Sequence, residues 1–344
     1  MTPHEHLGDA LATSADESSS EAVRSRAAQV LRPPGAMAVL DNLAAWLAGW
    51  QRTEKPSINA AGVAVFAADH GVAARGVSAF PSEITKAMVA AIESGQATCT
   101  ALARQVGASV ELVDVGVGDP TADFTVSDAL STDRFSKAWQ TGISTVADLH
   151  ERDGGIDLLI PGELGIGNTT AASAVAAAVI GGEPGEWCGR GTGVDDAGLS
   201  RKIETVTEGL QRIDGEQDPL EKLRRVGGAE LVAIAGATVE ARRRSIPVLL
   251  DGFIATAALA PLHAIDPTIL DHCVAGHASA EPGHQKLLDY LGKQPLLSLD
   301  LRLGEASGAL VALPLLRAAA TAVVDVATFA EAGITDAPND GDTD

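Results

Sequence analysis

Cysteine is scarce in this sequence: Cys99, Cys188 and Cys273 are the three cysteines of a 344-residue chain. They are odd in number, far apart and form no CxxC pair, which argues against a disulfide-rich secreted scaffold. We therefore expect a protein of the reducing cytoplasm.

Basic residues are also few, with 25 Lys and Arg against 46 Asp and Glu, a formal net charge of -21. Nucleic acids and anionic membrane surfaces both favour Lys and Arg, so neither is an expected partner. A small anionic substrate stays compatible with this charge, because one local pocket can oppose the overall field.

Long hydrophobic runs are missing as well. The apolar stretches are rich in Ala and are interrupted by Gly, Pro or Arg within about 12 residues, whereas a membrane helix needs roughly 20. Residues 1–26 lack the apolar core of a signal peptide. Hydrophobic residues nevertheless make up 46% of the chain, which is ample for a large buried core.

Between two polar ends, buried strand patterns alternate with helical patterns. This alternation predicts an α/β fold with a parallel sheet covered by helices on both faces. We expect strands at 62–71, 109–118, 156–160, 246–253 and 294–305. We expect helices at 36–51, 83–95, 171–182, 229–244, 254–264 and 306–324.

Polar residues follow four of the expected strands. They are Asp69-His70, Glu163 to Thr170, Asp251-Gly252 and Gly304-Glu305. Ligands of parallel α/β sheets bind beyond the carboxyl ends of the strands. The sequence therefore predicts that these residues share one rim, and that the protein is an enzyme.

The stretch "PGELGIGNTTAASAV" begins at Pro161, between a buried strand and a buried helix. Gly162, Gly165 and Gly167 allow close backbone approach, and Asn168, Thr169 or Thr170 can cap the helix. The N–H groups at a helix start favour a phosphate or carboxylate. A structural turn is the alternative, but Glu163 beside the loop favours a ligand site.

A second glycine-rich loop reads "GRGTGVDDAGLSRK" from Gly189 to Lys202. In the functional interpretation Gly191, Thr192 and Gly193 wrap a ligand and Lys202 adds a point charge to a phosphate. An ordinary surface loop with an exposed lysine explains the same residues equally well.

Three further segments carry polar candidates. "HCVAGHASAEPGH" fits no zinc pattern, so we expect no metal and assign Ser279 to a pocket. Ser78, Phe80 and Met88 can line a slot for a flat aromatic molecule, or serve only helix packing and capping. Glu305 begins an apolar helix, which stabilises its anion, whereas desolvation by nearby leucines raises its pKa.

Taken together, these segments resemble the family of nicotinate-nucleotide:dimethylbenzimidazole phosphoribosyltransferases over roughly residues 25–333. The resemblance is carried, in order, by "DHGVAARGVSAFPSEIT", "GELGIGNTTAASA", "GRGTGVDDAGLSRK", "GGAELVAIAG", "IPVLLDGFIATAAL", "HASAEPGH" and "LRLGEASGA". It implies a Rossmann-like parallel sheet, a smaller helical domain built from segments near both termini, and a homodimer.

The resemblance and the polar ends together predict the domain boundaries. We expect a flexible tail at 1–25, the first part of the small domain at 26–60 and the large α/β domain at 61–315. The second part of the small domain is expected at 316–334, followed by an acidic tail at 335–344.

The implied reaction moves the phosphoribosyl group of nicotinate mononucleotide to a benzimidazole-type base, without a cofactor. The resemblance makes Glu305 the catalytic base. Glu163, Lys202, Leu303 and Gly304 match further positions of the site, and the two glycine loops hold phosphate and ribose.

Four departures from the family pattern are Ala36, Ala87, Ala306-Ser307 and Val326. Ala87 and Ala306 lie near the expected base slot, so adenine or phenolic acceptors stay open. A dinucleotide-dependent dehydrogenase is disfavoured, because the first strand ends in "AADHG" rather than a glycine-rich turn. A non-catalytic nucleotide-binding regulatory protein is the other alternative.

Overall fold

The computed structural model of the chain describes residues 2–152, 154–191 and 193–334. These residues form two compact units. The larger comprises the described residues of 2–13 and 59–313, and the smaller comprises 14–58 and 314–334. Each unit is therefore assembled from segments that are distant in the sequence.

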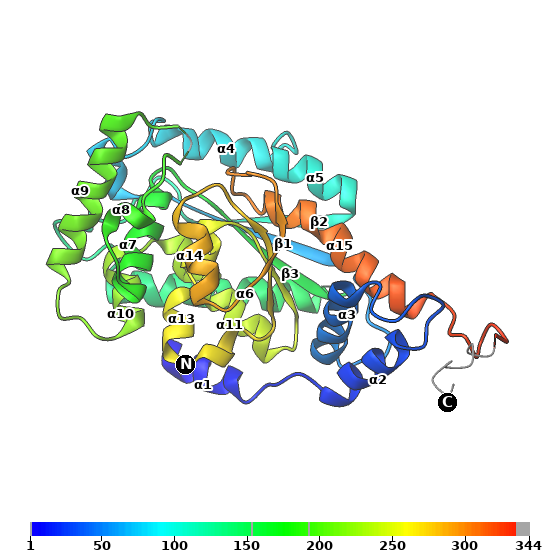
Figure 1. Ribbon diagram of the computed structural model, residues 1–344. Coiled ribbons are helices and arrows are strands. Elements are labelled where there is room, and N and C mark those ends of the chain that lie inside the picture. Colours follow the sequence, from blue (N-terminus) through cyan, green and yellow to red (C-terminus); the bar gives the residue numbers. More distant parts are fainter. Residues whose placement is uncertain (1, 153, 192, 335–344) are drawn as a thin grey trace, which may run out of the picture. The chain divides into compact units, whose positions relative to one another are not determined.

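Six strands of the larger unit form one parallel sheet in the order β2-β1-β3-β4-β5-β6 (Figure 1). The strands are β1 (Ala61–Ala68), β2 (Ala108–Gly116), β3 (Leu158–Leu164), β4 (Val248–Leu250), β5 (Cys273–Ala278) and β6 (Pro295–Ser298). The predicted parallel α/β sheet is confirmed. Its central strands β1, β3 and β4 are buried along their whole length, as continuous apolar runs predict.

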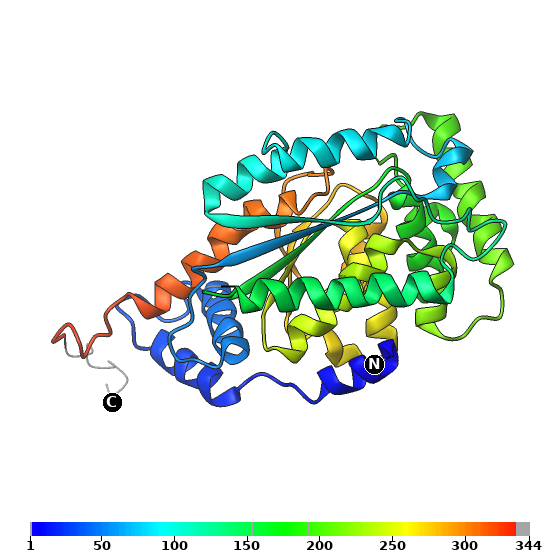
Figure 2. The ribbon, with the colours of Figure 1, turned by 180° about the vertical axis from the view of Figure 1, so that it is seen from behind.

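Helices cover both faces of this sheet. On one face lie α4 (Glu83–Glu93) and α5 (Thr98–Val106), and on the other lie α6 (Thr132–Glu151) and α11 (Ala229–Arg243) (Figures 1 and 2). α11 is buried on every side except its end, which explains why its sequence lacks a polar face. The remaining helices of this unit are α1 (Pro3–Leu11), α7 (Asn168–Ile180), α8 (Pro184–Trp187), α9 (Asp196–Arg212), α10 (Pro219–Val226), α12 (Phe253–Ala257), α13 (Ala260–Ile265) and α14 (Gly283–Tyr290), with 3₁₀ turns at Gly71–Arg75 and Pro267–Leu270.

The smaller unit is helical, with α2 (Glu17–Ala27), α3 (Ala38–Gln51) and the later part of α15 (Ser307–Val324). Its core combines side chains from both ends of the chain, namely Val23, Ala44, Ala45, Ala48, Ala319 and Val323. An isolated antiparallel bridge between Val30 and Thr328 also joins the two segments.

The expected flexible tail at 1–25 is wrong, because α1 and α2 occupy this stretch. Thr2 forms a capping box with Glu5, and Asp16 caps α2, so local caps organise a polar sequence that has little apolar pattern. His6 of α1 is buried, where its Nε2 lies 3.0 Å from Glu240. The expected tail at 335–344 lies outside the described residues.

Other element boundaries also differ from expectation. The expected helix 254–264 is interrupted between α12 and α13, next to Pro261, which occupies an early position of α13. The extended run at 294–305 ends at Ser298, where β6 stops. β5 was missed by the sequence pattern, because Gly276 and His277 interrupt its apolar residues.

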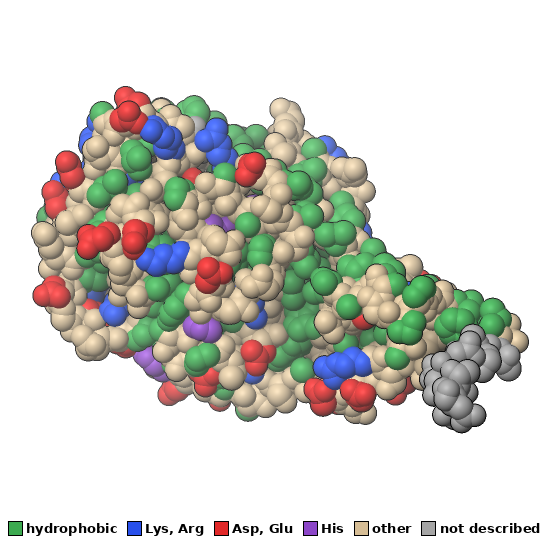
Figure 3. Space-filling model, in the orientation of Figure 1, with side chains coloured by type: hydrophobic (Ala, Val, Ile, Leu, Met, Phe, Trp, Pro, Cys, Tyr) green, Lys and Arg blue, Asp and Glu red, His purple; other side chains and the backbone are tan. Residues whose placement is uncertain are grey.

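Among the described residues, one helix is long and apolar enough to cross a membrane by length and composition: α15, over residues 307–324. The sequence predicted that apolar stretches are interrupted within about 12 residues. The apolar stretch of α15 spans 18 residues, and Pro314 and Arg317 lie within it. Of its residues, 56% are buried inside the protein, the behaviour of a core helix. On the face of the larger unit seen in Figure 3, acidic and basic side chains are interspersed rather than gathered by sign.

Candidate active site

A cavity of about 350 Å³ opens at the carboxyl ends of the strands of the larger unit. The end of β3, the start of α7, helix α4, the segment after β5 and the segment after β6 all contribute to its wall. The lining residues are Phe80, Ile84, Met88, Glu163, Leu164, Gly165, Ile166, Asn168, Thr169, Gly191, Gly252, Phe253, Ile254, His277, Ser279, Glu281, Arg302, Leu303, Gly304 and Glu305. Residues from three of the four predicted strand ends therefore line one cavity, whereas Asp69, His70 and Asp251 lie outside its wall.

Glu163 belongs to β3 itself rather than to the loop that the sequence suggested. It is 5% exposed, and its Oε2 accepts a hydrogen bond from the side-chain amide of Asn168. Burial, and then the neighbouring carboxylates Asp251 and Glu230, raise the pKa of Glu163 well above its ordinary value. An acid in this position favours its neutral form.

The backbone around Glu305 has an uncommon conformation. Gly304, Glu305 and Ala306 have φ angles of 86°, 58° and 61°, all left-handed. Non-glycine residues adopt this conformation at a cost, typically where surrounding structure imposes it. Gly162 permits the arrangement, because a Cβ there would lie 2.9 Å from both N and Cβ of Ala306.

Glu305 is 4% exposed, and its Oε2 has no hydrogen-bond partner among the described residues. Burial raises the pKa of Glu305, Asp251 raises it further, and the thiol and backbone amide of Cys99 at the start of α5 lower it. The net shift of the Glu305 pKa is upward. Desolvation of the carboxylate therefore outweighs its stabilisation by the start of the helix, a balance that the sequence could not decide. A raised pKa makes a carboxylate a stronger base.

Lys202 lies behind the cavity wall, with 1% exposure. Its Nζ donates to Thr169 Oγ1 (3.0 Å) and to the carbonyl oxygen of Gly189 (2.8 Å). Burial lowers the pKa of this ammonium, while Glu281 raises it. Lys202 therefore joins the second glycine loop to the start of α7, and the interpretation of it as an exposed surface lysine is wrong.

The structure brings most of the predicted site residues into the cavity wall: Glu163, Gly165, Asn168, Thr169, Gly191, Ser279, Leu303, Gly304 and Glu305. Ser78, Gly167, Thr170 and Gly193 are not lining residues. The hydroxyl of Ser78 accepts a hydrogen bond from the amide of Phe80 (3.2 Å), and Gly167 is the left-handed N-cap of α7. Thr192 lies outside the described residues.

The sequence placed the segment with His277 and Glu281 around a pocket but assigned only Ser279 to the site, and it did not single out Arg302; all three of the other side chains line the cavity. Glu281 and His277 belong to the "HASAEPGH" segment, whose role depended on recognising β5. Arg302 lies three residues before Glu305, in the irregular segment between β6 and α15. Because this segment has neither helical nor strand periodicity, the sequence does not indicate which way its side chains point. Their common placement follows from β5 and β6 being neighbours in the sheet.

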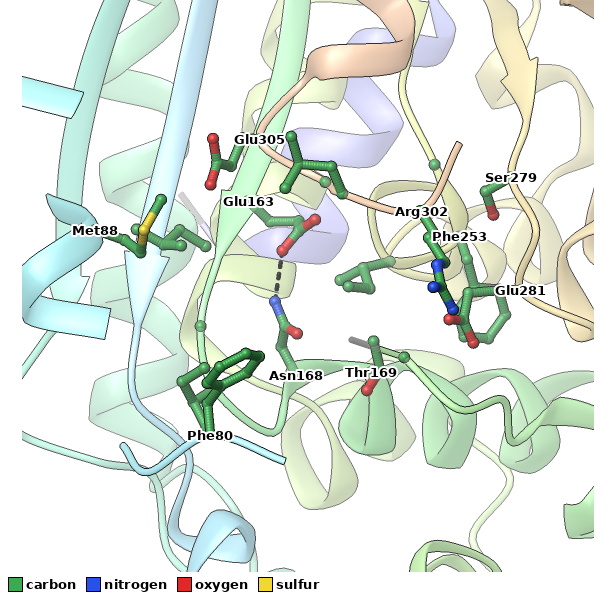
Figure 4. A pocket seen from close by; sticks show the side chains of 18 of the residues that line it. Phe80, Met88, Glu163, Asn168, Thr169, Phe253, Ser279, Glu281, Arg302 and Glu305 are labelled. Atoms are coloured by element: carbon green, nitrogen blue, oxygen red, sulfur yellow. Dashed lines mark hydrogen bonds between the residues drawn. The ribbon is translucent and has the colours of Figure 1, made fainter. Parts of the chain in front are cut away.

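The two sides of the cavity differ in character (Figure 4). Met88 and Glu305 lie on one side, and Ser279, Glu281 and Arg302 lie on the other. On the second side, Ser279 Oγ and Glu281 Oε2 have no hydrogen-bond partner in the described part of the chain. Buried polar atoms without partners are costly unless a ligand or water satisfies them, so this side is suited to a polar ligand group.

A metal centre is not assembled here. Over residues 2–152, 154–191 and 193–334, no three His, Cys, Asp or Glu side chains are grouped so that they could hold a metal ion. His284 illustrates why: its Nδ1 accepts from the amide of Ser279 (2.8 Å), and burial lowers its pKa to about 3.

Comparisons with known proteins agree with this geometry. A family model described as "Phosphoribosyltransferase" matches residues 12–334. A nicotinate-nucleotide–dimethylbenzimidazole phosphoribosyltransferase from Roseobacter denitrificans is 50% identical over 93% of this chain and 94% of its own. Another, from Cereibacter sphaeroides, is 48% identical over 93% of each chain. The crystal structure of CobT from Thermus thermophilus superposes with a TM-score of 0.88 at 40% identity, covering 93% of this chain and 100% of its own.

Proposed function

The chain belongs to the nicotinate-nucleotide–dimethylbenzimidazole phosphoribosyltransferase family, and we propose that it catalyses the reaction of that name. It transfers the 5-phosphoribosyl group of nicotinate mononucleotide to 5,6-dimethylbenzimidazole or a related aromatic base. The products are α-ribazole 5′-phosphate and nicotinate. The observation that carries this proposal is the buried carboxyl of Glu305, which faces the cavity with one oxygen free of protein partners among the described residues.

The chemistry requires a base more than an acid. The leaving group is nicotinate, whose ring nitrogen is positively charged while it is bonded to C1′. When the bond breaks, that nitrogen becomes neutral, so the leaving group needs no proton from an acid. When one nitrogen of the benzimidazole bonds to C1′, the other nitrogen must lose its proton. Glu305 takes that proton, and the upward shift of its pKa suits the task. Holding both substrates in orientation supplies much of the remaining acceleration.

An apolar side of the cavity fits the acceptor. Phe80, Ile84 and Met88 come from α4 and the segment before it, and Leu303 comes from the segment after β6. Flat aromatic molecules bind such surfaces, and Glu305 lies on the same side as Met88 (Figure 4). We therefore place the base here, with its reacting nitrogen toward C1′ and its other nitrogen toward Glu305.

The polar side fits the ribose phosphate. The start of α7, with Asn168 and Thr169, offers helix N-terminal N–H groups for an anion. Gly191 brings a second stretch of backbone to the same wall, and Lys202 fixes Thr169 from behind. Glu163 lies between the two sides of the cavity (Figure 4), and its carboxyl accepts a hydrogen bond from the side-chain amide of Asn168.

The decisive test is incubation of the protein with nicotinate mononucleotide and a panel of benzimidazoles, adenine and phenols, with nicotinate release as the readout. We expect release with dimethylbenzimidazole, and the panel ranks other acceptors. Correctly folded protein that releases nicotinate with no acceptor in the panel would overturn the transferase assignment and favour a nucleotide-binding regulatory protein.

The role of Glu305 has a separate test. Glu305→Gln should abolish turnover while the affinity for nicotinate mononucleotide, measured by calorimetry, is retained. Glu93→Gln, at the exposed end of α4, is the matched control and should behave as wild type. Normal turnover in Glu305→Gln would refute the proposed base.

We further propose a cytoplasmic homodimer. Cys99, Cys188 and Cys273 are free and buried, as expected of a reducing compartment. Phe80 and Leu303 are 46% and 47% exposed beside the cavity, so a second copy would cover apolar surface there. Sedimentation at several concentrations measures the assembly, and a monomer throughout would contradict it.

A further inference from the structure

Glu163 has a buried pair of a histidine and a carboxylate on each side of it. The strand that carries Glu163, β3, lies between β1 and β4 in the sheet. His70 follows β1, and its Nε2 lies 2.7 Å from Oε1 of Glu230 in the first turn of α11. Asp251 follows β4, and its Oδ1 lies 3.4 Å from Nε2 of His277 in β5. These four paired side chains are at most 3% exposed.

Each carboxylate of the two pairs also lies at the start of a helix. Glu230 is in the first turn of α11, and Asp251 Oδ1 accepts a hydrogen bond from the amide of Ala309 in the first turn of α15 (2.9 Å). The dipole of a helix and its N-terminal N–H groups stabilise a carboxylate as an anion. The histidine beside each acid adds one more N–H donor when its Nε2 carries the proton. This arrangement favours the anionic form of Glu230 and Asp251 despite their burial.

Glycines let both histidine rings reach their carboxylates. A Cβ on Gly228, the N-cap of α11, would lie 2.3 Å from His70 Cε1, and a Cβ on Gly308 in α15 would lie 2.2 Å from His277 Nε2. Burying an ionisable pair costs free energy that apolar residues of similar volume often avoid. The same construction on both sides of β3 therefore indicates a role beyond packing.

The two anions act on the carboxyl of Glu163. Burial raises the pKa of Glu163 most, and the charges of Asp251 and then Glu230 raise it further. Glu305 acts in the same direction, whereas the side-chain amide of Asn168 opposes it by donating to Oε2. The groups around Glu163 thus favour its neutral form from both neighbouring strands.

Two further titratable groups face the pairs. Asp69 precedes His70, and its Oδ2 accepts a hydrogen bond from the amide of Gly118 (2.8 Å). The ring of His284 lies 6.1 Å from that of His277, measured between centroids, and burial lowers the pKa of His284 to about 3. His284 is therefore neutral, and neither group supplies a positive charge that would cancel the two anions.

We propose that Glu230 and Asp251, each held by its histidine, are positioning residues that keep a proton on the Glu163 carboxyl and thereby assign the role of proton acceptor to Glu305. This inference rests on the proposed function, in which the acceptor base loses a proton to one of the acids of the cavity wall. Two acids in one site take different roles when their surroundings favour different protonation states. A neutral Glu163 also adds no negative charge beside an anionic nucleotide.

Infrared difference spectroscopy of the unliganded protein tests the proton directly. The spectrum of wild type minus that of Glu163→Gln should contain the carbonyl stretch of a protonated carboxyl group at neutral pH. Glu230→Gln and Asp251→Asn each remove one charge and keep a hydrogen-bond acceptor. In either variant, measured against the same variant with Glu163→Gln, the band should disappear at a pH at least about 1 unit lower than in wild type, the effect of one nearby charge. Asp133→Asn, at an exposed acid in the first turn of α6, is the control and should leave the band unchanged.

Turnover gives a second readout. At a pH where wild type keeps the band and Glu230→Gln has lost it, we expect Glu230→Gln to lower kcat/KM for nicotinate release by about tenfold, because an ionised Glu163 repels the anionic donor. The loss should shrink to within about twofold when Glu230→Gln is made in the Glu163→Gln background, where residue 163 has no proton to lose. A purely structural effect of Glu230→Gln would be the same in both backgrounds. Asp251→Asn is less selective in this assay, because Asp251 also acts on Glu305.

Three results would overturn the proposal: no Glu163 band in wild type at neutral pH, a band with the same pH dependence in wild type, Glu230→Gln and Asp251→Asn, or equal losses of turnover in the two backgrounds. The infrared experiment needs no substrate. It therefore decides on the proton of Glu163 even if wild type releases no nicotinate, a result that would overturn the proposed function alone. If Glu230→Gln does not fold, Asp251→Asn still tests the other side of Glu163 in the infrared experiment.

Discussion

The main-chain amide of Glu305 donates a hydrogen bond to the main-chain carbonyl of Glu163 (3.2 Å). One backbone contact thus joins the end of β3 to the left-handed segment before α15, and it sets the spacing between the two acids. The contact requires close approach of the two chain segments, which the glycine at position 162 allows.

Gly162→Ala should displace the Glu305 segment, because the added Cβ would lie 2.9 Å from backbone and side-chain atoms of Ala306. We expect a loss of about 1–3 kcal/mol in the free energy of unfolding, typical of overpacking, and at least a tenfold loss of turnover. Denaturant unfolding and nicotinate release measure the two effects. Gly8→Ala, at an exposed helical position with open space, is the control and should stabilise by up to about 1 kcal/mol. Full activity in Gly162→Ala would show that the segment tolerates displacement.

Glu163→Gln should raise stability at alkaline pH. The carboxyl titrates near 4.5 when unfolded and well above that value when folded, owing to burial and nearby acids. Between these two values the folded state holds a proton that the unfolded chain has lost, so stability falls as pH rises through this window. Glutamine stays neutral and can still accept from Asn168. Thermal unfolding from about pH 4.5 to 8.5 should show a gain over wild type that grows with pH, and a constant difference would contradict the buried acid.

Cys99→Ala should move the acid limb of the pH–rate profile to higher pH. Burial and the Glu305 charge raise the pKa of the Cys99 thiol to about 12, so it stays a protonated donor. Removing that donor takes away an interaction that lowers the pKa of Glu305. Cys273→Ala removes another buried thiol outside the cavity wall and should leave the profile in place. An unshifted profile in Cys99→Ala would mean that the thiol does not tune the base.

Lys202→Met should weaken binding of nicotinate mononucleotide and remove the alkaline rise of its KM. Burial lowers the pKa of Lys202 below its ordinary 10.5, so wild type loses this positive charge earlier on the alkaline side than an exposed lysine would. The neutral variant has no such charge to lose, and its KM should be higher but flat over the same range. Steady-state kinetics from about pH 7 to 10 measure both. A persisting alkaline rise in the variant would assign it to another group.

The sequence predicted the glycine loop and Glu305 better than it predicted the opposite side of the cavity. Glu163 to Thr170 and Gly304-Glu305 directly follow apolar runs, so their place at a strand end can be inferred from local pattern. Arg302, Glu281 and His277 cannot be recognised in that way. β5 is short and contains Gly276 and His277, and the segment before Glu305 is irregular after Ser298.

The N-terminal stretch shows a different limit. Residues 1–25 are polar, and composition alone suggests a tail. Their helices are stabilised by caps at Thr2 and Asp16 and, for α1, by burial of His6 and Leu7. A few buried side chains suffice to order a segment, and such contacts depend on surfaces built by distant residues.

By itself, the sequence determined the alternation of strands and helices, the parallel sheet and the polar groups that follow β1, β3 and β4, because these follow from periodicity and local backbone chemistry. Only the tertiary structure decided the protonation tendency of Glu305 and Glu163 and the position of Arg302 in the cavity wall. Those properties depend on desolvation and on charges brought near from elsewhere in the chain, and no local pattern encodes such distances.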